Sequence, residues 1–172
     1  MRALPRVLLA VYTAALLWLI LFKFSVHIAA VLHHDQRSVN LVPFSNASGS
    51  SGEMVDNVLV FIPFGLLLGV NCKRLDLWRK LVIVLVFSLT AEVLQYIFAI
   101  GASDITDVIT NTFGGLVGLL AYALGSRLIR QESLDRFIVF AGTALLAVVL
   151  FLLAAVEVRH GVRYHSLHKS GS

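Results

Sequence analysis

The fold of this chain is decided by residues 81–126, which read LVIVLVFSLTAEVLQYIFAIGASDITDVITNTFGGLVGLLAYALGS. Two apolar segments stand out here, Leu81–Ile100 and Val108–Ser126. Each is close to the roughly 20 residues that a helix needs to cross a bilayer. Because only a short polar stretch separates them, we predict two membrane-spanning helices joined as an antiparallel hairpin.

Three further apolar segments have similar character: Val7–Phe22, Asn57–Cys72 and Phe137–Val156. The first follows two arginines, but no clear signal-peptidase site comes after it, so we interpret it as an uncleaved anchor. The second is short and contains Pro63, which leaves a re-entrant segment as the alternative to a full span. We predict an all-α, polytopic transmembrane helical bundle with about five membrane-spanning helices.

The composition agrees with a membrane protein. Of the 172 residues, 58% are hydrophobic and 14% are charged, which is far from the balance of a soluble domain. The net charge of +4 comes from short clusters that flank apolar segments, so we expect the lipid bilayer and no nucleic acid as partner. The single cysteine, Cys72, excludes an intrachain disulfide.

The distribution of lysine and arginine predicts the orientation. Nine of these fourteen residues lie in 1–6, 73–80 and 127–136, which places the N-terminus in the cytoplasm. Five crossings then place the C-terminus outside, against the three positive charges of the tail. We predict a single domain over 1–158 and a polar, disordered tail over 159–172.

A loop is expected between the first two spans, from about His33 to Met54. Its stretch Ser45–Gly52 is rich in serine and glycine, a composition typical of flexible segments.

Glu92 is the most informative polar residue. It lies about 12 Å from the predicted outer end of its helix, where a carboxylate costs on the order of 3 kcal/mol and normally faces a partner or a cavity. Gln95 lies on the same helical face, as does Ser88. This stripe predicts a functional site inside the bundle.

The next helix continues the polar set from the other arm of the hairpin. Asp104, Asp107 and Asn111 are spaced by three and four residues and share one face. With the polar residues at the outer end of the second span, they form one predicted outward-facing layer. The candidate ligand-binding residues are Asn57, Glu92, Gln95, Asp104, Asp107 and Asn111.

Each of these features also has a purely structural interpretation. The amides can simply hydrogen-bond between helices, and Asp104 and Asp107 can serve as helix caps. Gly114 and Gly118 form a small-xxx-small pattern, which we interpret as a packing surface, either within the chain or between copies in a homo-oligomer.

Four pieces of this chain, taken in order, resemble the VanZ-like family: Asn40–Phe44, Asn57–Gly65, Glu92–Gln95 and Asp104–Gly115. The resemblance implies a multi-pass protein of the bacterial cytoplasmic membrane, in a family whose namesake is linked to resistance to the glycopeptide teicoplanin. Many members carry an arginine shortly before the Asp-x-x-Asp element. This chain has Gly101-Ala102-Ser103 there, which puts an ion pair with those acids in doubt.

Three functions are open. The resemblance favours a non-enzymatic envelope protein whose outward pocket binds a lipid-linked or glycopeptide-like ligand. The second is a membrane-embedded enzyme acting on a lipid or cell-wall precursor, with Glu92 as general acid or base and Asp104 and Asp107 as ligands for a divalent metal. The third is a proton-coupled transporter or flippase that uses Glu92. No other cofactor is expected.

Overall fold

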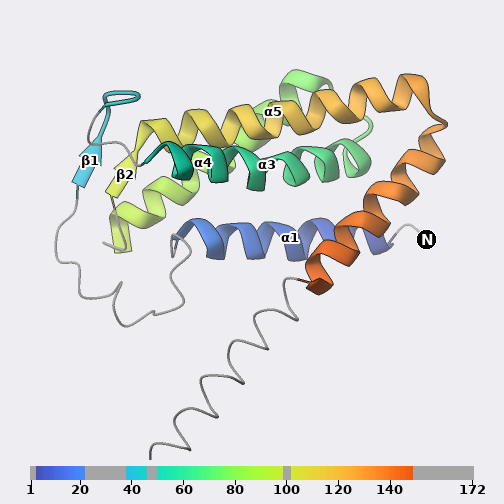
Figure 1. Ribbon diagram of the computed structural model, residues 1–172, viewed down its shortest axis with the longest axis horizontal. Coiled ribbons are helices and arrows are strands. Elements are labelled where there is room, and N and C mark those ends of the chain that lie inside the picture. Colours follow the sequence, from blue (N-terminus) through green and yellow to red (C-terminus); the bar gives the residue numbers. More distant parts are fainter. Residues whose placement is uncertain (1–2, 22–37, 46–49, 99–101, 149–172) are drawn as a thin grey trace, which may run out of the picture.

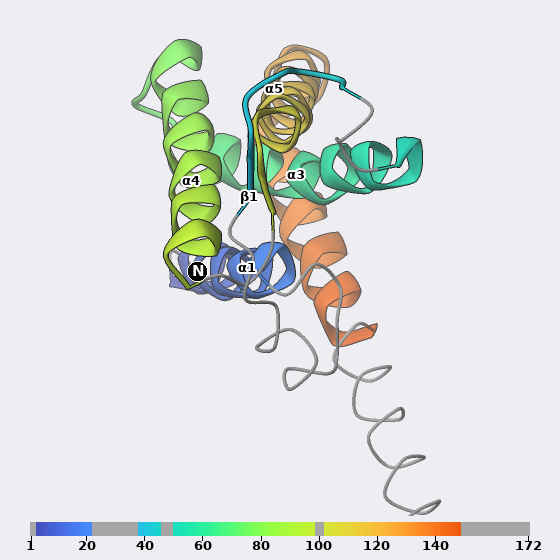
Figure 2. The ribbon, with the colours of Figure 1, turned by 90° about the vertical axis from the view of Figure 1, so that its left-hand side faces the viewer.

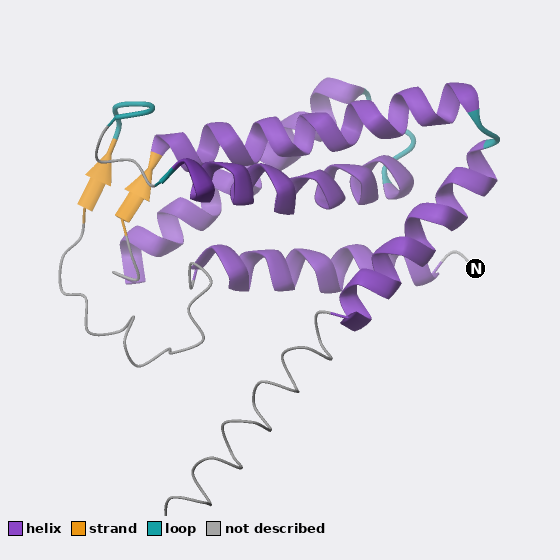
Figure 3. Cartoon of the chain, in the orientation of Figure 1, coloured by secondary structure: helices purple, strands orange, loops and turns teal. Residues whose placement is uncertain are grey.

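The protein is a bundle of long helices. The computed structural model describes residues 3–21, 38–45, 50–98 and 102–148. Four helices within these ranges are long and apolar enough to cross a membrane: α1 (Ala3–Leu21), α3 (Ser51–Asn71), α4 (Leu77–Phe98) and α5 (Ile105–Leu128). They lie alongside one another in Figures 1 and 3, and the predicted all-α transmembrane bundle is confirmed.

A further helix covers residues 131–148 and crosses the flank of the bundle. It contains the beginning of the fifth predicted span, Phe137–Val156, whose residues 149–156 lie outside the described residues. The predicted tail over 159–172 also lies outside them.

Helix α3 shows how local chemistry fixes a boundary. It begins six residues before the predicted span because Ser50 caps it: its side-chain oxygen accepts a hydrogen bond from the Glu53 N–H at 3.3 Å. It then continues through Pro63 to Asn71 as one helix of 21 residues. A continuous helix of this length agrees with a full span and not with the re-entrant alternative.

Glycines bring α3 and α5 into close contact. A methyl group added at Gly114 would lie 2.3 Å from the Val58 carbonyl oxygen, and one at Gly118 would lie 2.1 Å from that of Ile62. Only a residue without Cβ permits this approach. The predicted packing surface is therefore used inside one chain, and association of copies stays a prediction.

Aromatic and aliphatic side chains fill the centre of the bundle. Phe61, Phe64 and Phe87 form a cluster with ring centroids 5.1–6.1 Å apart. Helix α1 covers this cluster with Leu16, and its Tyr12 hydroxyl donates to the Val60 carbonyl at 2.7 Å. These contacts hold α1 against α3 at mid-height.

Two short strands lie across one end of the bundle, as the end-on view in Figure 2 shows. β1 (Ser38–Asn40) pairs in parallel with β2 (Ala102–Asp104), and Asn40 stands opposite Asp104. We call residues 38–45 the strap. The sequence predicted a loop here. Residues 41–45 are loop, but residues 38–40 form a strand instead, and the strap is attached to the beginning of α5.

Charge divides the bundle into two ends. All eight lysines and arginines that the structure describes lie at the end opposite the strap, where three acids accompany them. We call this the basic end, and its net formal charge is +5. The other five described acids lie toward the strap: Glu53, Asp56, Glu92, Asp104 and Asp107.

Candidate functional site

The candidate site is built around Asp104, which lies between β2 and α5. Asp104 is the N-cap of α5, and its Oδ1 accepts a hydrogen bond from the Thr106 N–H at 2.8 Å. Its Oδ2 accepts a second one from the side-chain amide of Asn40 at 3.0 Å. The capping role suggested by the sequence is confirmed for Asp104, and the same carboxylate also fastens the strap.

Glu92, near the end of α4, is hydrogen-bonded to the backbone of Asp104. Its side chain is buried, and Oε2 accepts a hydrogen bond from the Asp104 backbone N–H at 3.0 Å. Ser103 donates from its hydroxyl to the Glu92 carbonyl at 2.9 Å. Ser103 thus occupies the stretch where many family members carry an arginine, and here it makes a neutral hydrogen bond.

The remaining predicted residues connect different pairs of helices. The Asn57 amide on α3 donates to Asp107 Oδ1 on α5 at 2.9 Å. The Asn111 amide on α5 donates to the Ser88 hydroxyl on α4 at 2.9 Å. Gln95 donates instead to the Ile20 carbonyl of α1 at 2.9 Å. Gln95 thus bonds α1 and not the α3–α5 pair, and the predicted set divides into several interhelical links.

These links are deeply buried. Gln95 is 0% exposed and Asn111 is 1% exposed, so their amide oxygens are shielded from solvent. Neither oxygen has a hydrogen-bond partner among the residues that the structure describes. A buried acceptor without a donor costs about 1–3 kcal/mol. These two oxygens are therefore places where a donor from water or a ligand would stabilise the protein.

The accessible part of the site lies nearer the strap. Asn40 and Asn57 are both half-buried, and each donates to a buried carboxylate beneath it. Two neighbouring hydrogen-bonded groups together make up what we call the strap network: Asn40, Ser45, Glu92, Asp104 and Thr106, and the pair Asn57 and Asp107. Within the strap network Asn40, Ser45 and Asn57 are half-buried, and the other four residues are buried.

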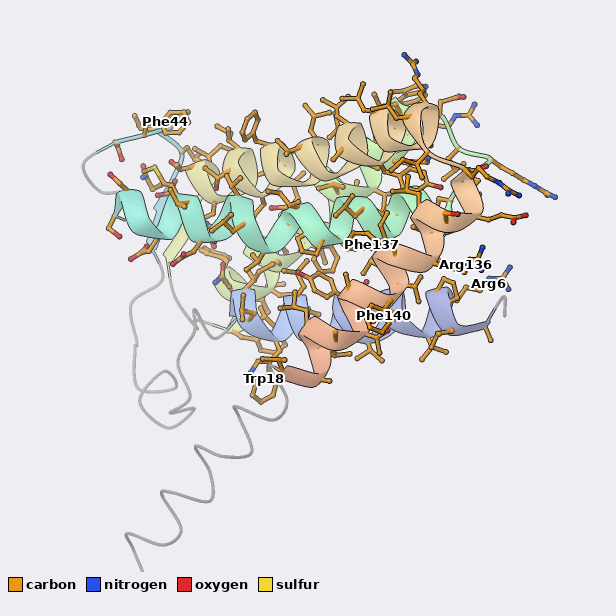
Figure 4. All side chains as sticks on the ribbon, turned by 45° about the vertical axis from the view of Figure 1, so that its right-hand side comes forward. Arg6, Trp18, Phe44, Arg136, Phe137 and Phe140 are labelled. Carbon is orange, nitrogen blue, oxygen red and sulfur yellow. The ribbon has the colours of Figure 1, made fainter. Side chains whose placement is uncertain are left out.

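The strap also presents apolar side chains. Leu41, Val42 and Phe44 are 73%, 63% and 61% exposed, and Figure 4 shows Phe44 projecting from this end. Phe44 has a φ of 55°, an uncommon conformation for a bulky residue, and its N–H donates to the Thr106 hydroxyl at 3.0 Å. The strap is thus held in a strained shape that points its apolar residues outward.

Sequence reasoning missed the strap as part of the site. In the sequence Asn40 and Phe44 stand out only as members of a motif, and Thr106 does not stand out. The available signal was the motif's own composition: Asn40 Oδ1 accepts from the Val42 N–H at 3.1 Å, a local turn that asparagine favours. That signal predicts a turn but not its partner.

Asp104 and Asp107 were the predicted metal ligands. Within the described ranges, no group of three or more His, Cys, Asp or Glu side chains is arranged to hold a metal ion. Both carboxylate oxygens of Asp104 accept hydrogen bonds, one from Thr106 and one from Asn40. Asp107 accepts a hydrogen bond from Asn57. Metal binding by these two acids stays a prediction.

Comparison with known proteins gives the family. A model of the VanZ/LLP1 family matches residues 9–129. The chain is 53% identical over 149 residues to "Protein VanZ" of Enterococcus faecium, an alignment that covers 87% of this chain and 92% of the relative. No solved structure matches this chain significantly. Apart from Ser45, the residues of the strap network lie in the four pieces of sequence that carry the resemblance. This chain belongs to the VanZ/LLP1 family.

Proposed function

We propose that this protein lies in the bacterial cytoplasmic membrane and binds a lipid-linked or glycopeptide-like ligand at its strap end. Binding there would contribute to resistance against glycopeptides such as teicoplanin, the phenotype linked to the family's namesake. Its membership of the VanZ/LLP1 family supports this proposal.

The charge distribution supports an outward-facing strap. Lysine and arginine flank membrane helices preferentially on the cytoplasmic side. The basic end carries every described lysine and arginine, so it belongs in the cytoplasm and the strap end belongs outside. A ligand in the envelope would then reach the strap without crossing the bilayer.

The observation that carries the proposal is that polar amides and exposed apolar side chains lie next to each other at the strap end. The half-buried amides of Asn40 and Asn57 lie above buried carboxylates, and the exposed apolar side chains of the strap lie beside them. An amphiphilic ligand needs both kinds of contact. Polar groups of the ligand would bind at the asparagines, while its apolar part would pack on Leu41 and Phe44.

The same geometry favours binding over catalysis. The described carboxylates of Glu92, Asp104 and Asp107 all accept hydrogen bonds from the protein. A general acid or base has to reach a substrate proton within hydrogen-bond distance, and these groups are buried. The enzyme and transporter hypotheses stay predictions.

The test is glycopeptide susceptibility of a sensitive bacterial host that expresses the chain. We expect the wild type to raise the minimal inhibitory concentration of teicoplanin, and Asn57→Ala to return it to the level of the empty vector. Asp107→Asn keeps an acceptor for Asn57 but removes the charge, and we expect an intermediate result.

Glu53→Gln is the matched control, because Glu53 is exposed one turn earlier on α3. It should behave like the wild type. Membrane abundance is measured for each variant by immunoblot. Full resistance in Asn57→Ala at wild-type abundance would show that the strap network does not bind the relevant ligand.

A further inference from the structure

A cavity lies at the basic end, at the opposite end of the bundle from the strap. Its volume is about 890 Å³, and it is bounded by the first turns of α1, the last turn of α3 and the helix over 131–148. Cavities of roughly 300–1,000 Å³ are typical of small-ligand sites. The proposed function makes no use of this cavity.

Two arginines provide its charge. Arg6 and Arg136 both line the cavity, and Figure 4 shows them at the same end of the molecule. Neither guanidinium forms a salt bridge with a residue that the structure describes, and the Arg136 Nε–H donates to the backbone carbonyl of Glu132 at 3.2 Å. The Asp135 carboxylate in the same wall is already engaged by Lys73 and by the Tyr122 hydroxyl. Two guanidinium groups with only Glu132 opposing them are suited to bind a phosphate.

Most of the remaining wall is apolar, which a water-soluble anion would not need. Its two neutral polar side chains, Asn71 and Thr143, already donate to backbone carbonyls. Val70 and Val139 are buried behind the cavity, whereas Leu4 and Phe140 are 55% and 75% exposed at its edge. Phe137, one turn away from Phe140, is also exposed. On a membrane protein, such exposed aromatic side chains face lipid. The cavity therefore combines a cationic rim with an apolar, lipid-facing flank.

The surroundings favour an anionic lipid. The net formal charge of +5 at this end attracts anionic headgroups, at about the depth where the spans end. Basic pockets between membrane helices are suited to such headgroups. We propose that this cavity binds the phosphate-bearing headgroup of an anionic phospholipid, with Arg6 and Arg136 on the phosphate and Phe140 against the acyl chains.

The test uses the full chain in nanodiscs of phosphatidylcholine with a minor fraction of phosphatidylglycerol. Native mass spectrometry then counts the phosphatidylglycerol retained after gentle extraction. We expect the wild type to retain it selectively. The variant Arg6→Gln/Arg136→Gln should bind about thirtyfold more weakly, since each arginine near a membrane surface contributes about 1 kcal/mol.

Arg127→Gln/Arg130→Gln is the matched control, because it removes the same charge at the same end from exposed residues outside the cavity lining. It should retain the lipid, and both variants should unfold at the wild-type temperature. Equal loss in the two double variants would reduce the effect to general surface charge and overturn the site. Equal retention of both lipids by the wild type would overturn it as well.

A competition arm separates a lipid from a soluble phosphate. Short-chain phosphatidylglycerol should displace the bound lipid much better than glycerol phosphate does, and Phe140→Ala should remove that advantage. Phe140 is a surface residue, so its truncation leaves the core intact. If glycerol phosphate competes as well as the short-chain lipid, the apolar flank has no role and the lipid assignment is wrong.

Discussion

The side-chain amide of Asn40 donates a hydrogen bond to Asp104 Oδ2 at 3.0 Å, across 64 positions of sequence. Asp104 is at the same time the N-cap of α5. One carboxylate therefore begins a membrane helix and holds the strap above it. A change that breaks the hydrogen bond between Asn40 and Asp104 should therefore loosen the strap while α5 stays folded.

Asn40→Ala is expected to release the strap. The variant removes hydrogen bonds to Asp104, to the Ser45 hydroxyl and to the Val42 N–H. A hydrogen bond to a charged group contributes roughly 1.5–3 kcal/mol. We expect faster limited proteolysis within residues 38–45, with the helix content by circular dichroism unchanged.

Leu41→Ala is the control for that experiment, because Leu41 is 73% exposed and its truncation removes little packing. Its proteolysis rate should match the wild type. Equal rates for Asn40→Ala and the wild type would mean that the pairing of β1 with β2 and the Phe44–Thr106 hydrogen bond hold the strap without the Asn40 side chain.

Gly118→Ala should destabilise the bundle. The new methyl group would lie 2.1 Å from the Ile62 carbonyl oxygen and 3.0 Å from the Leu66 nitrogen, so α3 and α5 would have to separate. Overpacking of this kind costs roughly 1–3 kcal/mol or more. A lower midpoint of thermal unfolding in detergent is the expected result.

Gly52→Ala serves as its control, since the added methyl group there meets only the Ser50 hydroxyl at 3.6 Å. Its unfolding midpoint should stay within error of the wild type. A Gly118→Ala protein as stable as Gly52→Ala would show that the α3–α5 contact is looser than the structure has it.

The membrane spans could be predicted from the sequence because each span depends on the composition of its own segment. Bilayer thickness sets the length of each apolar segment, and a charge or glycine ends it. The predicted span Leu81–Ile100 therefore overlaps α4 as far as Phe98, although α4 begins four residues earlier, at Leu77. The buried carboxylate of Glu92 was also predictable, because a carboxylate in an apolar helix needs a partner.

The partners themselves were not predictable. Glu92 bonds the Asp104 N–H, Asp107 bonds Asn57, and Asn111 bonds Ser88. Which donor meets which acceptor depends on how far each helix is rotated and shifted, and that is set by packing over the whole bundle. The pairing of β1 with β2 is a long-range contact of three residues, too short to leave a periodic pattern.

The orientation of the bundle can be tested on the two ends of one helix. Cys72 follows α3 at the basic end, and Ser51 begins α3 at the strap end. We expect an impermeant thiol reagent added to intact cells to leave Cys72 unlabelled. In Ser51→Cys, combined with Cys72→Ser, the new thiol should react.

A permeant thiol reagent supplies the control, because Cys72 is only partly buried and should react once the reagent has crossed the membrane. Labelling of Cys72 by the impermeant reagent, with protection of the cysteine at position 51, would invert the bundle. The strap would then face the cytoplasm, and a ligand in the envelope could not reach the proposed site.

The contact between Lys73 and Asp135 predicts a dependence of stability on alkaline pH. The hydrogen bond to Asp135 raises the pKa of Lys73 above its ordinary value of 10.5, against the smaller opposing effect of burial. A cation whose pKa is raised by folding stabilises the folded state. That stabilisation is complete below pH 10.5 and is lost as the pH rises through the raised pKa. Lys73 is 43% exposed, so solvent screening limits the effect to at most about 1 kcal/mol.

Lys73→Met removes the ammonium group but keeps an unbranched side chain, so its comparison with the wild type reports the contribution of the Lys73 charge. The wild type should unfold at a slightly higher temperature than Lys73→Met near neutral pH, and the two midpoints should converge above pH 10.5. Lys80→Met is the control, since Lys80 lies at the same end and forms no salt bridge with a described residue. A difference between wild type and Lys73→Met that persists at the alkaline limit would mean that Lys73 stabilises through its methylene chain and not through its charge, because only the ammonium group loses its attraction to Asp135 on deprotonation.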